Sequence, residues 1–172
     1  MSKIDTKHFG ALEIAEDKIV TFPRGLIGFE RATRYFLRNA DKGDSFKWLQ
    51  SLDDPNLCFL VIEPATFMFD YTLEVPDATA RELKIDDPGE VLIYALVVVP
   101  EDPKKISANL CGPLVINAAS RLGAQVVSTD PNHKVRHFIL EEMKRNAATY
   151  FGLPAGAPEG KPPAADASKR GV

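Results

Sequence analysis

The chain has 172 residues, of which 45% are hydrophobic and 26% are charged, and its formal net charge at pH 7 is −3. That length fits one domain with a sizeable core plus a tail, and the mildly acidic balance argues against nucleic-acid binding over the whole surface, which requires clustered Lys and Arg. The first residues lack the apolar segment of a secretory signal, and no apolar run approaches the roughly 18 residues of a membrane span, so we expect a cytoplasmic protein.

The N-terminal residues have the pattern of a β-hairpin. Polar and apolar side chains alternate through residues 4–14, and Gly10 interrupts the alternation. Alternation of this kind places the apolar residues on one face, so we predict two strands with one solvated face. A further strand over residues 18–22 is rich in β-branched residues and ends at Pro23, which has no N–H to donate to a ladder.

A loop punctuated by glycines follows. Gly25 and Gly28 lie within a loop that presents Leu26, Ile27 and Phe29. Short strands then recur between turns rich in Gly, Pro, Asn and Asp. The predicted strands are residues 35–38, 46–51, 57–62, 70–75, 91–99, 107–110, 114–117 and 121–128. Strands at such short intervals favour an all-β, mainly antiparallel sandwich or barrel over βαβ units.

The character of the sequence changes near its end. Residues 136–150 contain good helix formers with apolar positions three to four apart, and Gly152 and Pro154 can end a helix. We therefore predict one domain over residues 1–153 that ends in a short helix. Residues 154–172 lack large apolar side chains before the last residue, which predicts a disordered tail.

The sequence contains no recognisable catalytic or cofactor-binding motif: GxSxG, the Walker loop, HExxH and a helix-opening GxGxxG are all missing. His133 and His137 have the spacing of one helix face, but a zinc site needs a third ligand. Because Pro131 favours a turn there, we interpret both histidines as solvated. Asp53 and Asp54 lie in a DDPN turn, where carboxylates accept backbone N–H groups. We expect neither an enzyme nor a metal or other cofactor.

An acidic and aromatic stretch after the 57–62 strand suits contact with another protein. Its acidic residues surround large apolar ones, and an exposed apolar cluster with a charged rim is typical of protein-binding surfaces. The alternative is an ordinary core with a charged rim. The candidate partner-binding residues are Glu63, Phe67, Phe69, Asp70, Tyr71 and Glu74.

Four amide side chains leave a second function open. They are Gln50, Asn109, Asn117 and Gln125. If they line the mouth of a barrel, the chain is a small-ligand-binding protein or an enzyme that uses that mouth. If they bond to buried backbone groups at strand ends, their role is structural, and we favour this interpretation because buried polar groups are almost always hydrogen-bonded.

Several sequence blocks together resemble the FliW family of flagellar assembly factors. They are KIDTKHFGALEI, VTFPRGLIGFE, FKWLQSLDDPNLCFLVIEP, YALVVVPEDP and ANLCGPLVIN followed by GAQVV, in that order, over about residues 3–128. The ordered combination is specific, although no single block is decisive. The resemblance implies a small antiparallel β-barrel-like domain.

The same resemblance implies a cytoplasmic protein that acts by binding. FliW-like proteins bind newly made flagellin and, when flagellin is exported, bind the RNA-binding translational regulator CsrA, which then no longer represses flagellin mRNA. The implied partners are therefore flagellin and a CsrA-type regulator, with no direct contact to nucleic acid or membrane. The predicted helix and tail extend past the usual family pattern, and the helix either closes one end of the barrel or touches a partner.

Overall fold

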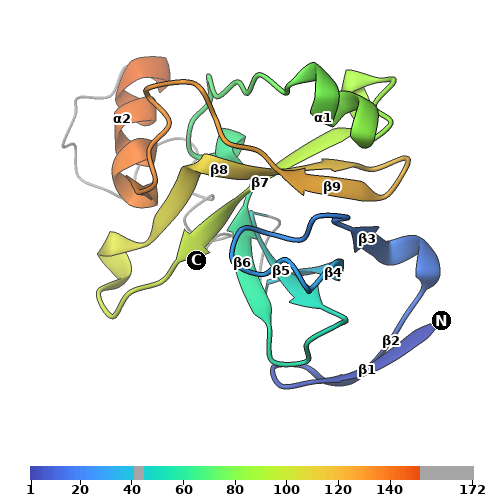
Figure 1. The fold of residues 1–172 in the computed structure, drawn as a ribbon. Helices are drawn as coiled ribbons and strands as arrows, with labels where there is room; N and C mark the ends of the chain where they lie inside the picture. Colours follow the sequence, from blue (N-terminus) through green and yellow to red (C-terminus); the bar gives the residue numbers. More distant parts are fainter. Residues whose placement is uncertain (41–44, 152–172) are drawn as a thin grey trace.

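Seven of the described strands close into a barrel (Figure 1). The computed structural model of the chain describes residues 1–40 and 45–151. Around the barrel the strands follow the order β8-β7-β6-β5-β4-β3-β9, and β9 returns to β8. The bounds are β3 Ile19–Thr21, β4 Arg34–Asn39, β5 Phe46–Ser51, β6 Cys58–Ile62, β7 Val91–Val98, β8 Ser107–Asn117 and β9 Leu122–Gln125. The all-β, mainly antiparallel prediction and the barrel-like expectation are confirmed.

The barrel closes where β3 meets β9. Every other neighbouring pair in the ring is antiparallel, whereas β3 and β9 are parallel and pair at Thr21 and Leu122. The Thr21 N–H also donates to the Arg121 carbonyl at 2.9 Å. This seam gives both end strands a partner, so the barrel lacks the open edges of a flat sheet.

Large apolar side chains fill the barrel. Phe22 and Tyr35 pack edge to face, with ring centroids 5.5 Å apart. Each large side chain that leaves water contributes about 1.5–3 kcal/mol, so this first core is a major source of stability. Its buried members are Val20, Phe22, Leu26, Ala32, Tyr35, Leu49, Val61, Tyr94, Leu114 and Ile116.

β8 is one long strand that contains a bulge, whereas the sequence predicts separate strands over 107–110 and 114–117. Its register against β7 shifts between those two stretches. The Asn109 Oδ1 accepts the N–H of Gly112 at 3.1 Å, so the amide replaces a ladder partner. Pro113 is tolerated inside β8 because a bulge does not require an N–H at every residue.

A second core lies between the projecting ends of β7 and β8 and the C-terminal helix α2 (Ile139–Phe151; Figure 1). The short strand β10 (His137–Phe138) pairs with β8, and for this reason α2 starts later than the predicted 136–150 helix. The predicted tail, residues 154–172, lies outside the described residues. Buried members of the second core are Phe46, Ile62, Phe67, Ala95, Ile106, Ala108, Leu110 and Ile139.

Residues 70–75 are not a strand, which corrects the prediction. Their side chains alternate between exposed and half-buried, but Leu73 and Val75 pack in a cluster with Leu83 and Val115, and no described strand pairs with this segment. Alternation alone therefore indicated a strand where an extended loop occurs. This loop is flanked by η2 (Pro64–Thr66), α1 (Asp77–Glu82) and η3 (Pro88–Glu90).

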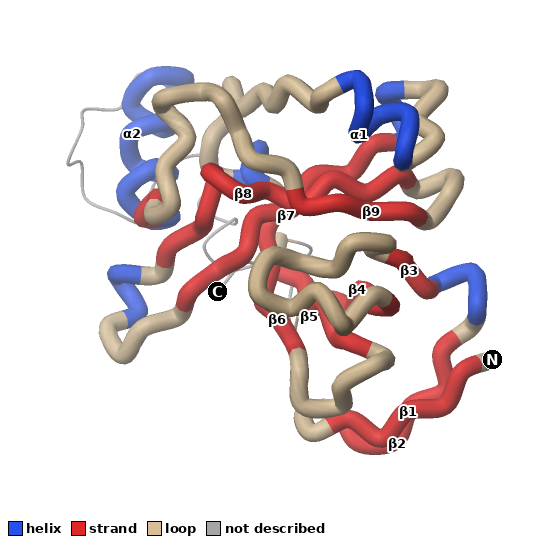
Figure 2. The backbone as a smooth tube through the Cα atoms, in the orientation of Figure 1, coloured by secondary structure: helices blue, strands red, loops and turns tan. Residues whose placement is uncertain are grey.

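The predicted N-terminal hairpin is confirmed. β1 (Ser2–Thr6) and β2 (Gly10–Ile14) form their own two-stranded sheet, which Figure 2 shows beside the barrel. The ring of Phe9, in the turn of the hairpin, meets the Trp48 ring edge-on with centroids 6.2 Å apart. This contact fixes the hairpin to β5. The remaining short elements are η1 (Glu16–Lys18) and η4 (Pro103–Lys105).

Candidate partner-binding surfaces

The predicted partner-binding residues lie between the end of β6 and the start of α1. Glu63, Asp70 and Glu74 are exposed, and the Phe69 side chain is 42% exposed. All four residues therefore reach the molecular surface. We call them the Glu63 surface.

Two of the predicted contact residues, Phe67 and Tyr71, are fully or partly buried, so they are not part of the Glu63 surface. Phe67 is fully buried in the second core, because the η2 turn directs it inward, so it does not belong to an exposed apolar cluster as expected. Tyr71 is half-buried and stacks on the His133 ring at a centroid distance of 4.9 Å. Burial, together with the nearby Asp130 charge, raises the pKa of Tyr71 to about 12.

Helix α2 holds the segment that carries the Glu63 surface. The Asn146 Nδ2 donates to the Phe67 carbonyl at 2.6 Å and to the Glu142 carbonyl at 2.7 Å. The apolar side of α2, with Ile139 and Met143, packs on the second core. The helix therefore supports the surface from below, and whether it also touches a partner stays a prediction.

His133 and His137 are buried, which corrects the solvated interpretation. Their exposed fractions are 8% and 6%. The Lys134 N–H donates to the His137 Nε2 at 2.8 Å, so the ring proton lies on Nδ1, which is 2.6 Å from the Glu142 Oε2. His137 therefore joins β10 to α2 as a structural residue.

The Ser128, Asp130 and His133 side chains lie together but brace a turn. The Ser128 Oγ is 2.6 Å from the His133 Nδ1 and accepts the Asp130 N–H at 3.2 Å. Tyr71 covers one face of the imidazole. Within residues 1–40 and 45–151, no group of three or more His, Cys, Asp or Glu residues is arranged to hold a metal ion.

The four amides bond to backbone groups, which confirms the structural interpretation. The Gln50 Nε2 donates to the Ser51 and Leu57 carbonyls. The Asn117 Nδ2 donates to the Leu83 carbonyl at 2.9 Å. The Gln125 Nε2 donates to the Gly112 carbonyl, and its Oε1 accepts the Ile27 N–H. The Asn109 Oδ1 accepts the Cys111 and Gly112 N–H groups in the β8 bulge. All four amides therefore stabilise loops or strands through hydrogen bonds to the backbone.

The Asp54 side chain bonds within the turn, as predicted, whereas the Asp53 side chain bonds to the start of β4. The Asp53 Oδ2 accepts the N–H groups of Thr33 and Arg34, and its Oδ1 accepts from the Arg34 guanidinium at 3.0 Å. Partial burial acts to raise the pKa of Asp53, but these hydrogen bonds and the guanidinium hold it below its usual value. The Asp54 Oδ1 accepts the Asn56 N–H at 3.0 Å.

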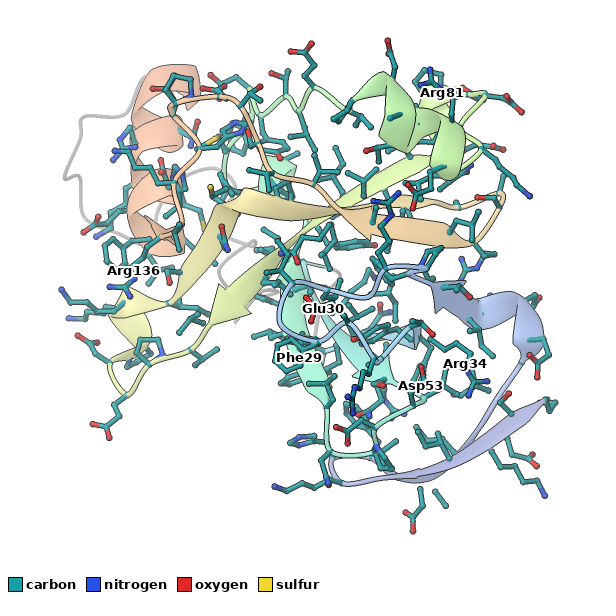
Figure 3. The ribbon with its side chains drawn as sticks, in the orientation of Figure 1. Phe29, Glu30, Arg34, Asp53, Arg81 and Arg136 are labelled. Atoms are coloured by element: carbon teal, nitrogen blue, oxygen red, sulfur yellow. The ribbon has the colours of Figure 1, made fainter. Side chains whose placement is uncertain are left out.

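The structure adds a hollow that the sequence does not assign to a site. This open hollow of about 360 Å³, which we call the Phe29 pocket, lies between the glycine loop and the Asp53–Asp54 turn. Phe29, Glu30 and Asp53 lie near one another in Figure 3, with Arg34 beside Asp53. The lining residues are Gly28, Phe29, Glu30, Arg31, Ala32, Asp53, Asp54 and Leu57.

One wall of the Phe29 pocket is aromatic. Phe29 is 43% exposed and meets the Phe59 ring edge-on, with centroids 5.1 Å apart. The rest of the lining includes three carboxylates, those of Glu30, Asp53 and Asp54, and one guanidinium, that of Arg31. The glycine loop was visible in the sequence. Asp53 and Asp54, however, lie in a turn more than twenty residues later, and the β4–β5 pairing brings this turn next to the loop.

Comparisons with known proteins agree on one family. A family model described as FliW protein matches residues 3–139. The flagellar assembly factor FliW of Ruminiclostridium cellulolyticum is 38% identical over 143 residues, covering 83% of this chain and 97% of the relative. The FliW of Treponema denticola is 39% identical over 146 residues, covering 85% and 97%.

A solved structure is also similar. A crystal structure of the flagellar assembly factor FliW matches with a TM-score of 0.75 and 36% sequence identity, over 80% of this chain and 96% of that one. The family model extends from β1 through the barrel to the first residue of α2. The chain therefore belongs to the FliW family.

Proposed function

We propose that this chain is a flagellar assembly factor that acts in the cytoplasm by stoichiometric binding. It binds newly made flagellin and, when flagellin is exported, binds a CsrA-type regulator, which then no longer represses flagellin mRNA. The observation that carries the proposal is the family match over residues 3–139 together with the similar fold of the solved FliW. No bond is made or broken in this mechanism.

Competition between the two partners links flagellin supply to export. A protein that binds one of two partners at a time divides itself between them by mass action. While free flagellin is abundant, the chain is occupied and the regulator remains free to repress. As export removes flagellin, the chain becomes available and takes up the regulator, so that translation resumes.

The charge of the chain suits a basic regulator. A CsrA-type protein is basic where it holds RNA, whereas this chain has a net charge of −3 and exposes Glu63, Asp70 and Glu74 on one segment. Opposite charges speed encounter and improve selectivity more than they raise affinity. We therefore assign the Glu63 surface to the regulator.

The ligand-binding alternative gains no support. The amides proposed to line a barrel mouth are engaged with backbone groups. Within the described part of the chain, no helix is long and apolar enough to cross a membrane. Partner binding accounts for the exposed acidic and aromatic residues without a small molecule.

Co-purification tests the proposal directly. The tagged full chain is isolated from cells with and without flagellin, and its bound proteins are identified by mass spectrometry. We expect flagellin in the first case and the regulator in the second, and purified flagellin should displace the regulator in a titration. Recovery of neither protein would refute the proposal, and a bound small molecule would favour the alternative.

Charge reversal tests the Glu63 surface. Glu63→Lys with Asp70→Lys should weaken regulator binding about tenfold or more, because it replaces attraction with repulsion. Both side chains are exposed, so the thermal midpoint should stay close to wild type. Calorimetric titration measures the affinity, and Glu90→Lys with Glu101→Lys, which makes the same charge change at two other exposed positions, is the control. Equal affinity in all three proteins would remove the Glu63 surface from the interface.

A further inference from the structure

The Phe29 pocket and the Glu63 surface lie at opposite ends of β6. Phe59, at the start of the strand, contacts the wall of the pocket, and Glu63 follows its last residue. A strand rises about 3.3 Å per residue, so about 13 Å separates the two positions. The pocket is therefore distinct from the surface assigned to the regulator.

Two carboxylates of the pocket interact with backbone amides and with no cation among the described ion pairs. The Glu30 Oε2 accepts the Gly28 N–H at 2.8 Å, and the Asp54 Oδ1 accepts the Asn56 N–H at 3.0 Å. The bond from Gly28 lowers the pKa of Glu30, so the group stays ionised at neutral pH. Arg31 is the one cationic residue of the lining, so carboxylates outnumber it.

We propose that the Phe29 pocket is a second protein-binding site, which takes a lysine or arginine side chain of a partner segment together with an adjacent apolar residue. The cationic head lies between Glu30 and Asp54, and its methylene stem and the apolar neighbour lie against Phe29 and Leu57. Long basic side chains commonly bury their stems on apolar surface in this way.

The charges of the pocket select this occupant. A phosphate or an acidic segment meets two unpaired carboxylates and is repelled. A wholly apolar segment displaces the water around Glu30 and Asp54 but offers these carboxylates no hydrogen-bond donor, which is unfavourable. A basic residue beside an apolar one satisfies both the carboxylates and the exposed Phe29 ring. The inference goes beyond the proposed function, because it concerns a different surface and does not depend on the regulator.

A short peptide tests the site on the full chain. The probe is acetyl-Gly-Lys-Phe-Gly-amide, followed by ¹H–¹⁵N NMR at pH 7 and low salt, and the matched peptide has norleucine in place of lysine. We expect saturable shifts of the Gly28, Glu30, Asp54 and Asn56 amides with the lysine peptide only. No shift at these residues, or equal shifts with both peptides, overturns the proposal.

Variants separate the pocket charges from net charge. Glu30→Gln with Asp54→Asn removes both charges but keeps oxygens that accept the Gly28 and Asn56 N–H groups. This double variant should bind the lysine peptide with at least fivefold lower affinity. The control is Asp87→Asn with Glu90→Gln, which makes the same charge change and keeps the Asp87 turn, in which Oδ1 accepts the Gly89 N–H. A similar loss in both double variants overturns the proposal.

The same proteins distinguish this inference from the proposed function. If the peptide binds the wild-type chain but flagellin and the regulator do not, the proposed function is refuted and the pocket inference is supported. If both proteins bind and the peptide does not, the pocket fails and the proposed function stands. Weaker binding of one protein to the Glu30→Gln, Asp54→Asn variant identifies which partner supplies the basic residue.

Discussion

Gly25 shapes the loop that presents Phe29. Its φ is +65°, a left-handed conformation that suits glycine. A Cβ at this position would lie 2.6 Å from the Glu30 Cα and 2.7 Å from the Phe29 carbonyl oxygen. The backbone of the loop therefore folds back on Gly25 closely enough to exclude any side chain.

Gly25→Ala should lower the free energy of unfolding by about 2–4 kcal/mol, from the left-handed conformation and from overpacking against backbone. Gly10→Ala is the matched control, because Gly10 has φ +71° but a Cβ there would meet no atom within 4 Å. It should cost only about 1–2 kcal/mol. Urea unfolding measures both, and equal losses would show that crowding at Gly25 is unimportant.

Turn chemistry could be predicted from single residues, but long-range burial could not. Asp54 behaves as a DDPN turn requires, since Asx side chains bond to backbone a few residues away, whereas the Asp53 carboxylate accepts from the distant Arg34 N–H. His133 also follows a turn, yet it is buried because Tyr71, distant in sequence, stacks on it. Phe67 is buried because α2 packs over it. Neither contact leaves a local sequence pattern.

Among the elements, α2 links the C-terminal region to the Glu63 surface. Its Asn146 amide bonds to the Phe67 carbonyl, shortly before the exposed Phe69 and Asp70. The loop thus depends on a helix that begins at the end of the family match. A substitution on the buried side of α2 should therefore alter the conformation of the Glu63 surface although none of its own residues is changed.

Asn146→Ala should destabilise the protein by about 1–2 kcal/mol, because it leaves the Phe67 carbonyl without its side-chain donor. Hydrogen exchange should also become faster at the Phe67 and Met68 amides, which bond to the Pro64 carbonyl. Lys144→Ala, on the exposed side of the same helix, is the control and should change neither quantity. Unaltered exchange in Asn146→Ala would show that α2 does not hold this loop.

Strands were predictable where apolar runs with β-branched residues are bounded by clear turns, as for β6 and β7. Residues 70–75 mislead because an extended loop that packs on one side shows the same alternation as a strand. For β8 the error is the opposite one: the sequence predicts a break, but a bulge accommodates Pro113 inside a continuous strand. The pocket was hidden for a related reason, because it combines a loop and a turn from separate parts of the chain.

At the scale of the whole molecule, the interior contains tyrosines that resist ionisation. Burial, and then the charges of Asp53 and Asp54, raise the pKa of Tyr35 to about 12. Burial, and then the charge of Glu63, raise the pKa of Tyr94 to about 12. Both side chains belong to the first core, so their ionisation is linked to the unfolding of the barrel.

Stability should therefore fall as the pH rises from about 10 to 12. An unfolded tyrosine ionises near pH 10, so in this window the unfolded chain holds fewer protons than the folded one and the free energy of unfolding decreases. Below about pH 9 these groups contribute no pH dependence. Circular dichroism during an alkaline titration measures the effect, and Tyr35→Phe should lessen it while leaving stability at pH 7 nearly unchanged. An identical alkaline transition in that variant would contradict the link.

The parallel seam between β3 and β9 has a consequence for biosynthesis. A nascent chain can form the β4–β5–β6 meander early, but residue 21 finds its partner only after residue 122 has left the ribosome. Contacts so distant in sequence form late and leave strand edges open in the meantime. A ribosome that stops before β9 therefore releases a product with an unsealed sheet, which is a ready substrate for chaperones and proteases. Only a chain translated past β9 can close the barrel.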